Sequence, residues 1–340
     1  MKLAISCGDL NGIGLECFFK ALLNYHFNEI SFHLFCNIAT LKSYISQLEI
    51  FKNLIEIEDN SIIINNNLIK IISFGNKFPV QFGRTTFEAG LHAIESIELA
   101  TRNVISKEYN AILTLPISKE SCRLAGLKFN GHTEFIASIC KVKQPLMILF
   151  YNNLRVALQT IHVPIKDVPN LIIKNKIVEK LEIFYKSLSL DFAVNPKIAV
   201  LGLNPHSGEN GLIGNDEILE IIPSINELSN KGYDIYGPFA ADGFFASNSY
   251  NKYSGIFAMY HDQGLIPLKF YSKGEAVNFT AGLPIIRTSP DHGTAFDISG
   301  LGIARYESTL NAIIAAKEIY FNRLSYESNR KQIINEQSEK

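Results

Sequence analysis

The sequence predicts an α/β fold with a largely parallel β-sheet. Short apolar runs rich in β-branched residues alternate with longer amphipathic stretches, which is the pattern of strands joined by helices. The 340 residues exceed what one small core requires, so one or two domains are expected. No repeat or clear linker interrupts the chain, so a division into two lobes would have to be discontinuous in sequence.

Seven apolar runs are predicted as strands: Lys2–Cys7, Ser31–Cys36, Ala111–Leu115, Leu146–Tyr151, Arg155–Ile161, Lys197–Leu203 and Gly255–Tyr260. The clearest helix is Thr85–Ser106, which opens with the capping-box pattern Thr85-x-x-Glu88 and continues with apolar residues at helical spacing. Residues 61–73 (SIIINNNLIKIIS) are predicted as a hairpin with an Asn-rich turn.

Composition and charge exclude several classes of protein. The net charge is −1 and the 32 basic residues are spread along the chain, which argues against a nucleic-acid-binding face. No apolar run approaches the length that spans a bilayer, so a soluble cytoplasmic protein without membrane contact is expected. The five cysteines are odd in number and form no C-x-x-C, a pattern of reduced thiols rather than of a disulfide framework or a thiolate zinc site.

Three histidines share one sequence context. His162, His206 and His261 each follow an apolar strand candidate. Ligands of open α/β sheets bind beyond the carboxyl ends of the strands, so three imidazoles placed there could converge on one divalent metal with an open position. The alternative is three unrelated histidines that hydrogen-bond to loops.

Two further groups of residues are candidates for anion binding. Gly131-His132-Thr133-Glu134 opens a short amphipathic helix, whose N-terminal N–H groups suit a phosphate or carboxylate. The alternative is that Thr133 or His132 only caps this helix. Lys269, Asn278 and Arg287 lie in an otherwise glycine-rich and apolar stretch, where cations are plausible anion clamps; taken singly, each is more often a solvated surface residue.

The first loop is glycine-rich but lacks a nucleotide-binding motif. Residues 8–14 (GDLNGIG) follow a strand candidate and precede a helix, yet their spacing is neither G-x-G-x-x-G nor a Walker loop. The glycines are equally explained by tight turning. No Gly-x-Ser-x-Gly elbow is present.

Seven ordered blocks, from the first strand to about Arg305, resemble the 4-hydroxythreonine-4-phosphate dehydrogenase family. They are GDLNGIGLE (8–16), FNGHTEF (129–135), RVALQTIHVPIKDV (155–168), GLNPHSGENGLIGNDE (202–217), GPFAADGFF (237–245), AMYHDQGLIPLK (258–269) and VNFTAGLPIIRTSPDHGTAFDISG (277–300). The first loop departs from the family, with Asp9-Leu10-Asn11 where Glu-Pro-Ala is common. None of the departures falls on a proposed ligand.

The resemblance implies a two-lobed fold like that of isocitrate and isopropylmalate dehydrogenases. It has mostly parallel sheets, helices on both faces and an active site in the cleft between the lobes. We expect residues 1–130 plus about 290–325 in the first lobe, 131–289 in a second lobe carrying metal and dimer contacts, and 326–340 as a polar tail. This fold binds dinucleotides without a Rossmann fingerprint.

The resemblance also implies roles for individual residues. The metal ligands are His162, His206 and His261, and the cofactor-binding residues are Gly282, Leu283, Pro284 and Asp297. The substrate-binding residues are His132, Thr133, Lys269, Asn278 and Arg287. Asp242 and Asp262 are candidates for the general base, although either could instead orient a metal ligand, and Lys269 could bind phosphate or act as an acid.

The implied reaction is NAD(P)-dependent oxidation of 4-phosphooxy-L-threonine to 2-amino-3-oxo-4-phosphooxybutanoate. This product decarboxylates to 3-amino-2-oxopropyl phosphate, in pyridoxine 5'-phosphate biosynthesis. One divalent metal, zinc, cobalt or magnesium, would lower the pKa of the alcohol. The family is homodimeric with the metal site shared across the interface, so one histidine is expected from the partner chain.

Three alternative functions remain open from sequence. The first is a metal-dependent dehydrogenase of another phosphorylated hydroxy acid, such as a phosphothreonate. The second is a three-His metallohydrolase, which predicts no nicotinamide binding. The third is a non-catalytic binding protein, which has no need for three convergent metal ligands.

Overall fold

The computed structural model describes residues 1–129 and 131–338, which form two compact units. Unit 1 comprises residues 1–145 and 283–320, and unit 2 comprises residues 146–282 and 321–340. The sequence predicts divisions after residues 130 and 289, whereas the units divide after 145 and 282. His132, Thr133 and Arg287 therefore belong to unit 1.

The sheet of unit 1 has the strand order β13-β6-β1-β2-β5-β4-β3. β6, β1, β2, β5 and β13 pair in parallel, and β3 and β4 extend the sheet antiparallel. The strands are β1 (Lys2–Ser6), β2 (Ser31–Phe35), β3 (Glu56–Ile57), β4 (Ser61–Ile64), β5 (Asn67–Ile72), β6 (Ala111–Thr114) and β13 (Arg287–Pro290). β1 and β6 are buried almost throughout, as expected of strands covered on both faces.

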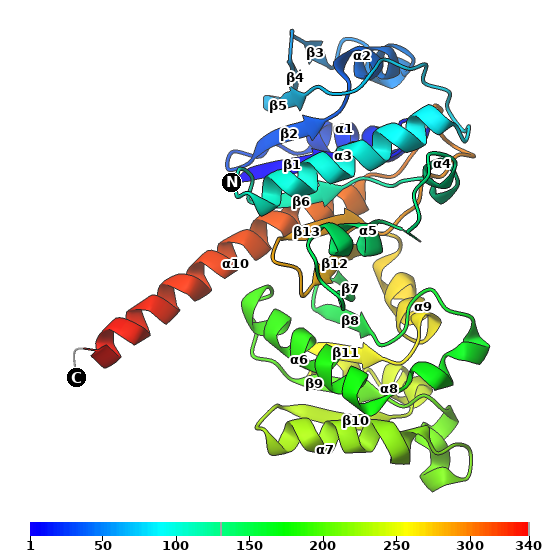
Figure 1. Ribbon diagram of the computed structural model, residues 1–340, viewed down its shortest axis with the longest axis vertical. Helices are drawn as coiled ribbons and strands as arrows, with labels where there is room; N and C mark the ends of the chain where they lie inside the picture. Colours follow the sequence, from blue (N-terminus) through cyan, green and yellow to red (C-terminus); the bar gives the residue numbers. More distant parts are fainter. Residues whose placement is uncertain (130, 339–340) are drawn as a thin grey trace. The chain divides into compact units, whose positions relative to one another are not determined.

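The helices of unit 1 are α1 (Gly14–Asn24), α2 (Ile38–Ser46), the short 3-10 helix η1 (Glu49–Phe51), α3 (Phe87–Ile105), α4 (Lys119–Leu124) and α5 (His132–Ile139). α3 packs across β1, β2 and β6, as Figure 1 shows. The last helix, α10 (Glu307–Ser338), begins in unit 1 and includes most of the predicted polar tail; residues 339–340 lie outside the described residues.

The sheet of unit 2 has the strand order β10-β9-β11-β8-β7-β12. β10, β9, β11 and β8 pair in parallel, while β7 pairs antiparallel with β8 and β12. The strands are β7 (Leu146–Tyr151), β8 (Leu154–Leu158), β9 (Ile198–Leu201), β10 (Ile235–Phe239), β11 (Gly255–Ala258) and β12 (Val277–Ala281). The predicted α/β class with mostly parallel sheets is confirmed in both units.

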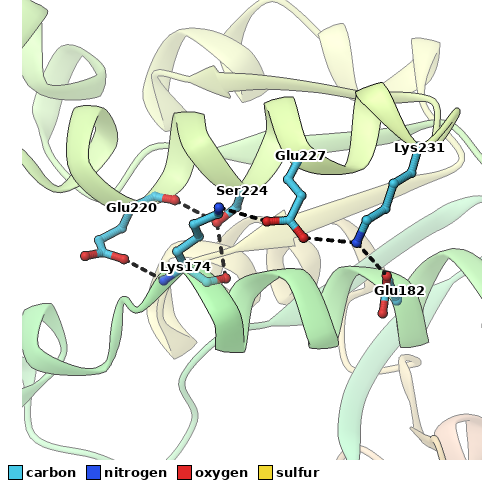
Figure 2. A network of polar contacts seen from close by, with 6 residues as sticks. All are labelled: Lys174, Glu182, Glu220, Ser224, Glu227 and Lys231. Carbon is cyan, nitrogen blue, oxygen red and sulfur yellow. Dashed lines mark hydrogen bonds and ion pairs between the residues drawn. The ribbon is translucent and has the colours of Figure 1, made fainter.

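The helices of unit 2 are η2 (Ile165–Asp167), η3 (Pro169–Leu171), α6 (Lys174–Leu190), η4 (Pro205–Gly211), the π-helix η5 (Glu217–Ile221), α7 (Ile222–Asn230), α8 (Ala241–Ala246), η6 (Ser249–Lys252) and α9 (His261–Ser272). A polar network joins α6 to η5 and α7 (Figure 2). Glu227 pairs with Lys174 at 2.8 Å and with Lys231 at 3.0 Å, and Glu220 accepts the backbone N–H of Lys174 at 2.6 Å. This network holds η5 in place. The first residue of η5, Glu217, binds Asn204 in the segment that leads to His206.

Two local predictions have different outcomes. The hairpin over residues 61–73 is confirmed, because β4 and β5 pair antiparallel around Asn65 and Asn66, which both have positive φ. The capping box at Thr85 is wrong: the N-cap of α3 is the next residue, Thr86, whose hydroxyl accepts the N–H of Ala89. Two adjacent threonines offer alternative caps, and the Nδ2 group of Asn11 selects Thr86 by donating to its Oγ1.

The structure also bears on the expectations about membrane-spanning helices and about the cysteines. No helix in the described part of the chain is long and apolar enough to cross a membrane. All five cysteines are free thiols, as predicted.

Candidate active site

The three predicted metal ligands follow neighbouring parallel strands of unit 2. The order β9-β11-β8 places the strands that precede His206, His261 and His162 side by side. Because parallel strands end at the same edge of a sheet, all three histidines emerge at one edge. His162 lies in the loop after β8, His206 in η4 after β9, and His261 at the start of α9 after β11.

His162 and His261 lie next to each other in this structure. Their ring centroids are 5.9 Å apart, and both line a cavity of about 250 Å³ together with Tyr260 and Asp262. Asp262 Oδ1 lies 2.7 Å from His261 Nδ1. A neutral His261 that donates its Nδ1–H to this carboxylate carries its lone pair on Nε2, which is the arrangement by which carboxylates orient metal-binding imidazoles.

His206 is presented by an unusual left-handed stretch of backbone. His206, Ser207, Gly208, Glu209 and Asn210 all have positive φ, between 43° and 81°. Such a conformation costs roughly 1–2 kcal/mol for each residue with a side chain. A stretch of this kind persists only when surrounding contacts hold it.

A buried carboxylate, Glu217 at the start of η5, lies against this stretch and binds Asn204, the residue that caps its start. It is 1% exposed, and its two oxygens accept the backbone N–H of Asn204 at 2.8 Å and the Asn204 side-chain Nδ2 at 2.9 Å. A Cβ on Gly208 would lie 2.6 Å from Glu217 Oε2, so the loop wraps closely around the carboxylate. Glu217 was not predicted as a site residue, although it closes the family-like block at residues 202–217.

The three histidines do not form a tight cluster within one chain. Among the described residues, one group of histidine, cysteine or acidic side chains has all its ligand atoms within 4.8 Å of one another. This group is Cys7, Cys36 and His92, and not the three predicted ligands. His162 and His206 are both exposed. One chain thus brings together His162 and His261, with His206 on the adjoining strand end.

Unit 1 brings together His132, Thr133 and Arg287. His132 and Thr133 open α5, and His132 Nε2 lies 3.1 Å from the carbonyl oxygen of Leu115. Burial, and secondarily the charge of Arg287, lowers the pKa of His132 to about 3, so its imidazole is neutral. Arg287 is 2% exposed, its Nε donates to Thr114 Oγ1 at 3.0 Å, and burial lowers its pKa to about 10. A buried guanidinium beside a helix N-terminus is suited to a planar anion.

Unit 2 carries the other two predicted substrate residues. Lys269 is exposed on α9, the helix that begins with His261. Asn278 lies on β12, and its buried Oδ1 has no hydrogen-bond partner among the described residues. A buried acceptor left without a donor is costly, so it marks a position where a ligand donor would be stabilising.

The two candidate bases line one apolar cavity. Asp242 on α8 and Asp262 on α9 both border a cavity of about 470 Å³, together with Phe245, Ile266 and Phe270. Asp262 also borders the smaller cavity beside His162 and His261, whereas Asp242 does not. The structure therefore associates Asp262 with the histidines.

The predicted cofactor residues fall at the junction of the two units and in a turn of unit 1. Gly282, with φ +79°, ends unit 2, and Leu283 and Pro284 begin the next segment of unit 1. Asp297 is exposed in the turn after β13. The first loop packs on this turn: the N–H of Ile13 donates to Thr294 O at 3.0 Å, and a Cβ on Gly12 would lie 2.9 Å from Thr294. Gly12 thus allows close packing against Thr294, which is neither the nucleotide binding nor the tight turning considered from the sequence.

The chain is similar to known proteins of one family. The family model described as "Pyridoxal phosphate biosynthetic protein PdxA" matches residues 30–316. A 4-hydroxythreonine-4-phosphate dehydrogenase of Bacteroides thetaiotaomicron is 38% identical over 332 residues, covering 95% of this chain and 90% of that protein. One from a Sulfurihydrogenibium species is 39% identical, with coverages of 92% and 96%. The crystal structure of the Klebsiella pneumoniae enzyme of this name superposes with a TM-score of 0.81 at 32% identity, covering 94% of this chain and 99% of that one.

Proposed function

The chain belongs to the family of the pyridoxal phosphate biosynthetic protein PdxA, and from this premise we propose that it oxidises 4-phosphooxy-L-threonine. It is an oxidoreductase of pyridoxal phosphate biosynthesis that uses a nicotinamide cofactor, as its relatives' common name, 4-hydroxythreonine-4-phosphate dehydrogenase, implies. The observation that carries the proposal is the edge of the unit 2 sheet, where His162, His206 and His261 follow three adjacent parallel strands.

These three histidines fit a divalent metal ion. Their donors are imidazole nitrogens, which suit zinc and cobalt, and the Asp262 carboxylate is placed to orient His261. When bound, the metal would act as a Lewis acid that lowers the pKa of the substrate's secondary alcohol. Magnesium is the third candidate if substrate oxygens complete the site.

The protein's own residues have separate tasks in this proposal. The guanidinium of Arg287, Thr133 and neutral His132 bind the substrate's anionic groups, Asn278 accepts a hydrogen bond through its unpaired Oδ1, and Lys269 binds phosphate or returns a proton after decarboxylation. Asp262 borders the His162–His261 cavity, where it either orients His261 or acts as the general base, and Asp242 is the candidate base if Asp262 only orients His261. Gly282, Leu283, Pro284 and Asp297 are proposed on the cofactor side, with NAD or NADP as the hydride acceptor.

The test of the substrate is a comparison of two phosphorylated acids. We expect reduction of NAD or NADP with 4-phosphooxy-L-threonine and at least tenfold lower kcat/KM with a phosphothreonate. The reverse preference, measured on the same folded protein, would assign the chain to the alternative dehydrogenase activity. Phosphate release without cofactor reduction would favour a metallohydrolase.

We further propose that the active enzyme is a homodimer whose metal site combines histidines of both chains. Leu212 and Leu219, which follow the His206 segment in the sequence, are 86% and 66% exposed, and Phe270 and Ile266 on the helix of His261 are 86% and 66% exposed. Exposed apolar groups of this size next to two of the three ligands are explained if a second copy covers them.

Subunit mixing tests this shared site. His162→Ala and His206→Ala proteins are each expected to be inactive alone. When they are co-refolded, the mixture should regain up to about a quarter of the wild-type activity, averaged over all sites, if the two ligands come from different chains. No recovery from a demonstrated mixed dimer would place His162 and His206 in one chain, and the same failure when each is mixed with His261→Ala would refute the shared site. A cytoplasmic location is proposed as well, in keeping with the five free thiols.

A further inference from the structure

A second group of metal-binding side chains lies inside unit 1. The Sγ atoms of Cys7 and Cys36 and a ring nitrogen of His92 all lie within 4.8 Å of one another. Cys7 and Cys36 are 0% exposed and His92 is 3% exposed. None of the three belongs to the proposed active site.

The sheet register brings the two cysteines together. β1 and β2 pair in parallel with Ser6 opposite Phe35, so Cys7 and Cys36 are the next residues along on the two strands. Side chains at facing positions of adjacent parallel strands point to the same side of the sheet. α3 packs on these two strands (Figure 1). It contributes His92 and Ser96, one turn apart on its buried face.

The surroundings hold these side chains in place. Ser96 Oγ accepts the N–H of Cys7 at 3.0 Å and donates to Phe35 O at 2.7 Å, which ties α3 to both strand ends. The His92 ring stacks on Phe74, with ring centroids 4.4 Å apart. Its Nε2 accepts the N–H of Asn37, the residue after Cys36, at 3.1 Å and therefore carries the lone pair.

We propose that Cys7, Cys36 and His92 bind a thiophilic divalent cation of the zinc class, as a structural site separate from the three-histidine site. Two thiolates and one imidazole are soft to borderline ligands that disfavour magnesium, calcium and manganese. Two thiolates also balance the charge of a divalent ion, so the dry core would hold no net charge. Binding releases one proton from each thiol, and the Nε2 lone pair turns from the Asn37 N–H to the metal.

The geometry requires only a small contraction. With metal–sulfur bonds of about 2.3 Å and metal–nitrogen bonds of about 2.0–2.1 Å, ligand atoms of a tetrahedral site lie roughly 3.4–3.8 Å apart. The three ligand atoms already lie within 4.8 Å of one another, so shifts of about 1 Å per side chain suffice. The carbonyl oxygen of Gly8, 3.5 Å from Cys7 Sγ, is the nearest candidate for a fourth ligand.

Cobalt(II) distinguishes this site from the active site. Cobalt bound by thiolate shows sulfur-to-metal charge-transfer absorption in the near ultraviolet, whereas three histidines provide no sulfur. Titration of the metal-free, reduced full-length protein should produce this absorption with an end point of one thiolate-bound cobalt per chain. Excess zinc should abolish it by displacement.

Single substitutions identify which residues give rise to this charge-transfer absorption band. Cys7→Ser and Cys36→Ser should lose it, while Cys122→Ser, a matched buried cysteine of the same unit, and Cys140→Ser, the partly exposed one, should retain it. His162→Ala should retain it as well. Absence of the band in folded wild-type protein, or its persistence in both Cys7→Ser and Cys36→Ser, would overturn the proposal.

A second measurement needs no variant. X-ray absorption at the zinc edge of wild-type protein loaded with two equivalents of zinc should show, on average, one sulfur neighbour per zinc, because one of the two sites holds two thiolates. A spectrum with nitrogen and oxygen neighbours only would overturn the proposal even if the cysteine variants fail to fold.

Discussion

The carboxylate of Glu217 should set the metal affinity of the active site through the loop of His206. Glu217→Gln keeps the size of the side chain but replaces one acceptor oxygen by an NH2 group. Because both Glu217 oxygens accept N–H groups of Asn204, one of these two hydrogen bonds must be lost. A hydrogen bond to a charged group contributes about 1.5–3 kcal/mol, which corresponds to roughly a 10- to 150-fold fall in the population of the positioned loop.

The assay is competition for zinc between the protein and a chromogenic chelator, together with kcat and KM. We expect zinc affinity to fall by about 10- to 100-fold and activity to be partly restored by excess metal, as for other residues that orient a metal ligand. Glu220→Gln is the matched control, since Glu220 lies on the same helix η5 but binds Lys174 instead of the His206 loop. Unchanged zinc affinity in Glu217→Gln would refute this role.

Three further outcomes are expected. Asp262→Asn should lower zinc affinity about tenfold in the same competition assay, because the carboxylate beside His261 Nδ1 is lost; an unchanged affinity would show that this pair is incidental. Arg287→Lys should raise KM by about 10- to 100-fold, because a lysine cannot reproduce a forked guanidinium contact; steady-state kinetics with a KM within twofold of wild type would contradict it. His132 is neutral in the folded chain, with a pKa of about 3 against 6.5 ordinarily, so below about pH 6.5 the protein takes up a proton when it unfolds. The free energy of unfolding, measured with urea, should therefore fall from about pH 6.5 toward about pH 4 more steeply in the wild type than in His132→Gln.

Periodic features of the chain were predictable from sequence. The strand predicted for Leu146–Tyr151 has the observed bounds, and the other six differ only at their ends. Asn-rich turn chemistry located the β4–β5 hairpin correctly. These signals are local, so no tertiary contact was needed to interpret them. The choice between Thr85 and Thr86 as the cap of α3 does depend on a tertiary contact, with Asn11, and was predicted wrongly.

Features that depend on long-range pairing were not predictable in this way. Cys7 and Cys36 have no metal-binding sequence spacing, and only the β1–β2 register places their side chains together. Glu217 could have been noticed as an acidic residue in a family-like block, but its role follows from burial and from two hydrogen bonds to Asn204. For His162, His206 and His261, the strand-end pattern predicted the shared edge of the sheet; their convergence on a metal remains a prediction.

The measurement that tests the central claim most directly is the formation of reduced nicotinamide from 4-phosphooxy-L-threonine by chelator-stripped protein. The assay is run with NAD and with NADP, and without metal or with added zinc, cobalt or magnesium. Our account predicts turnover that requires one of these metals and is lost in His162→Ala, His206→Ala and His261→Ala. Metal-independent turnover, or full activity in any of the three variants, would contradict the assignment of these histidines, and no turnover with any metal or cofactor would contradict the substrate.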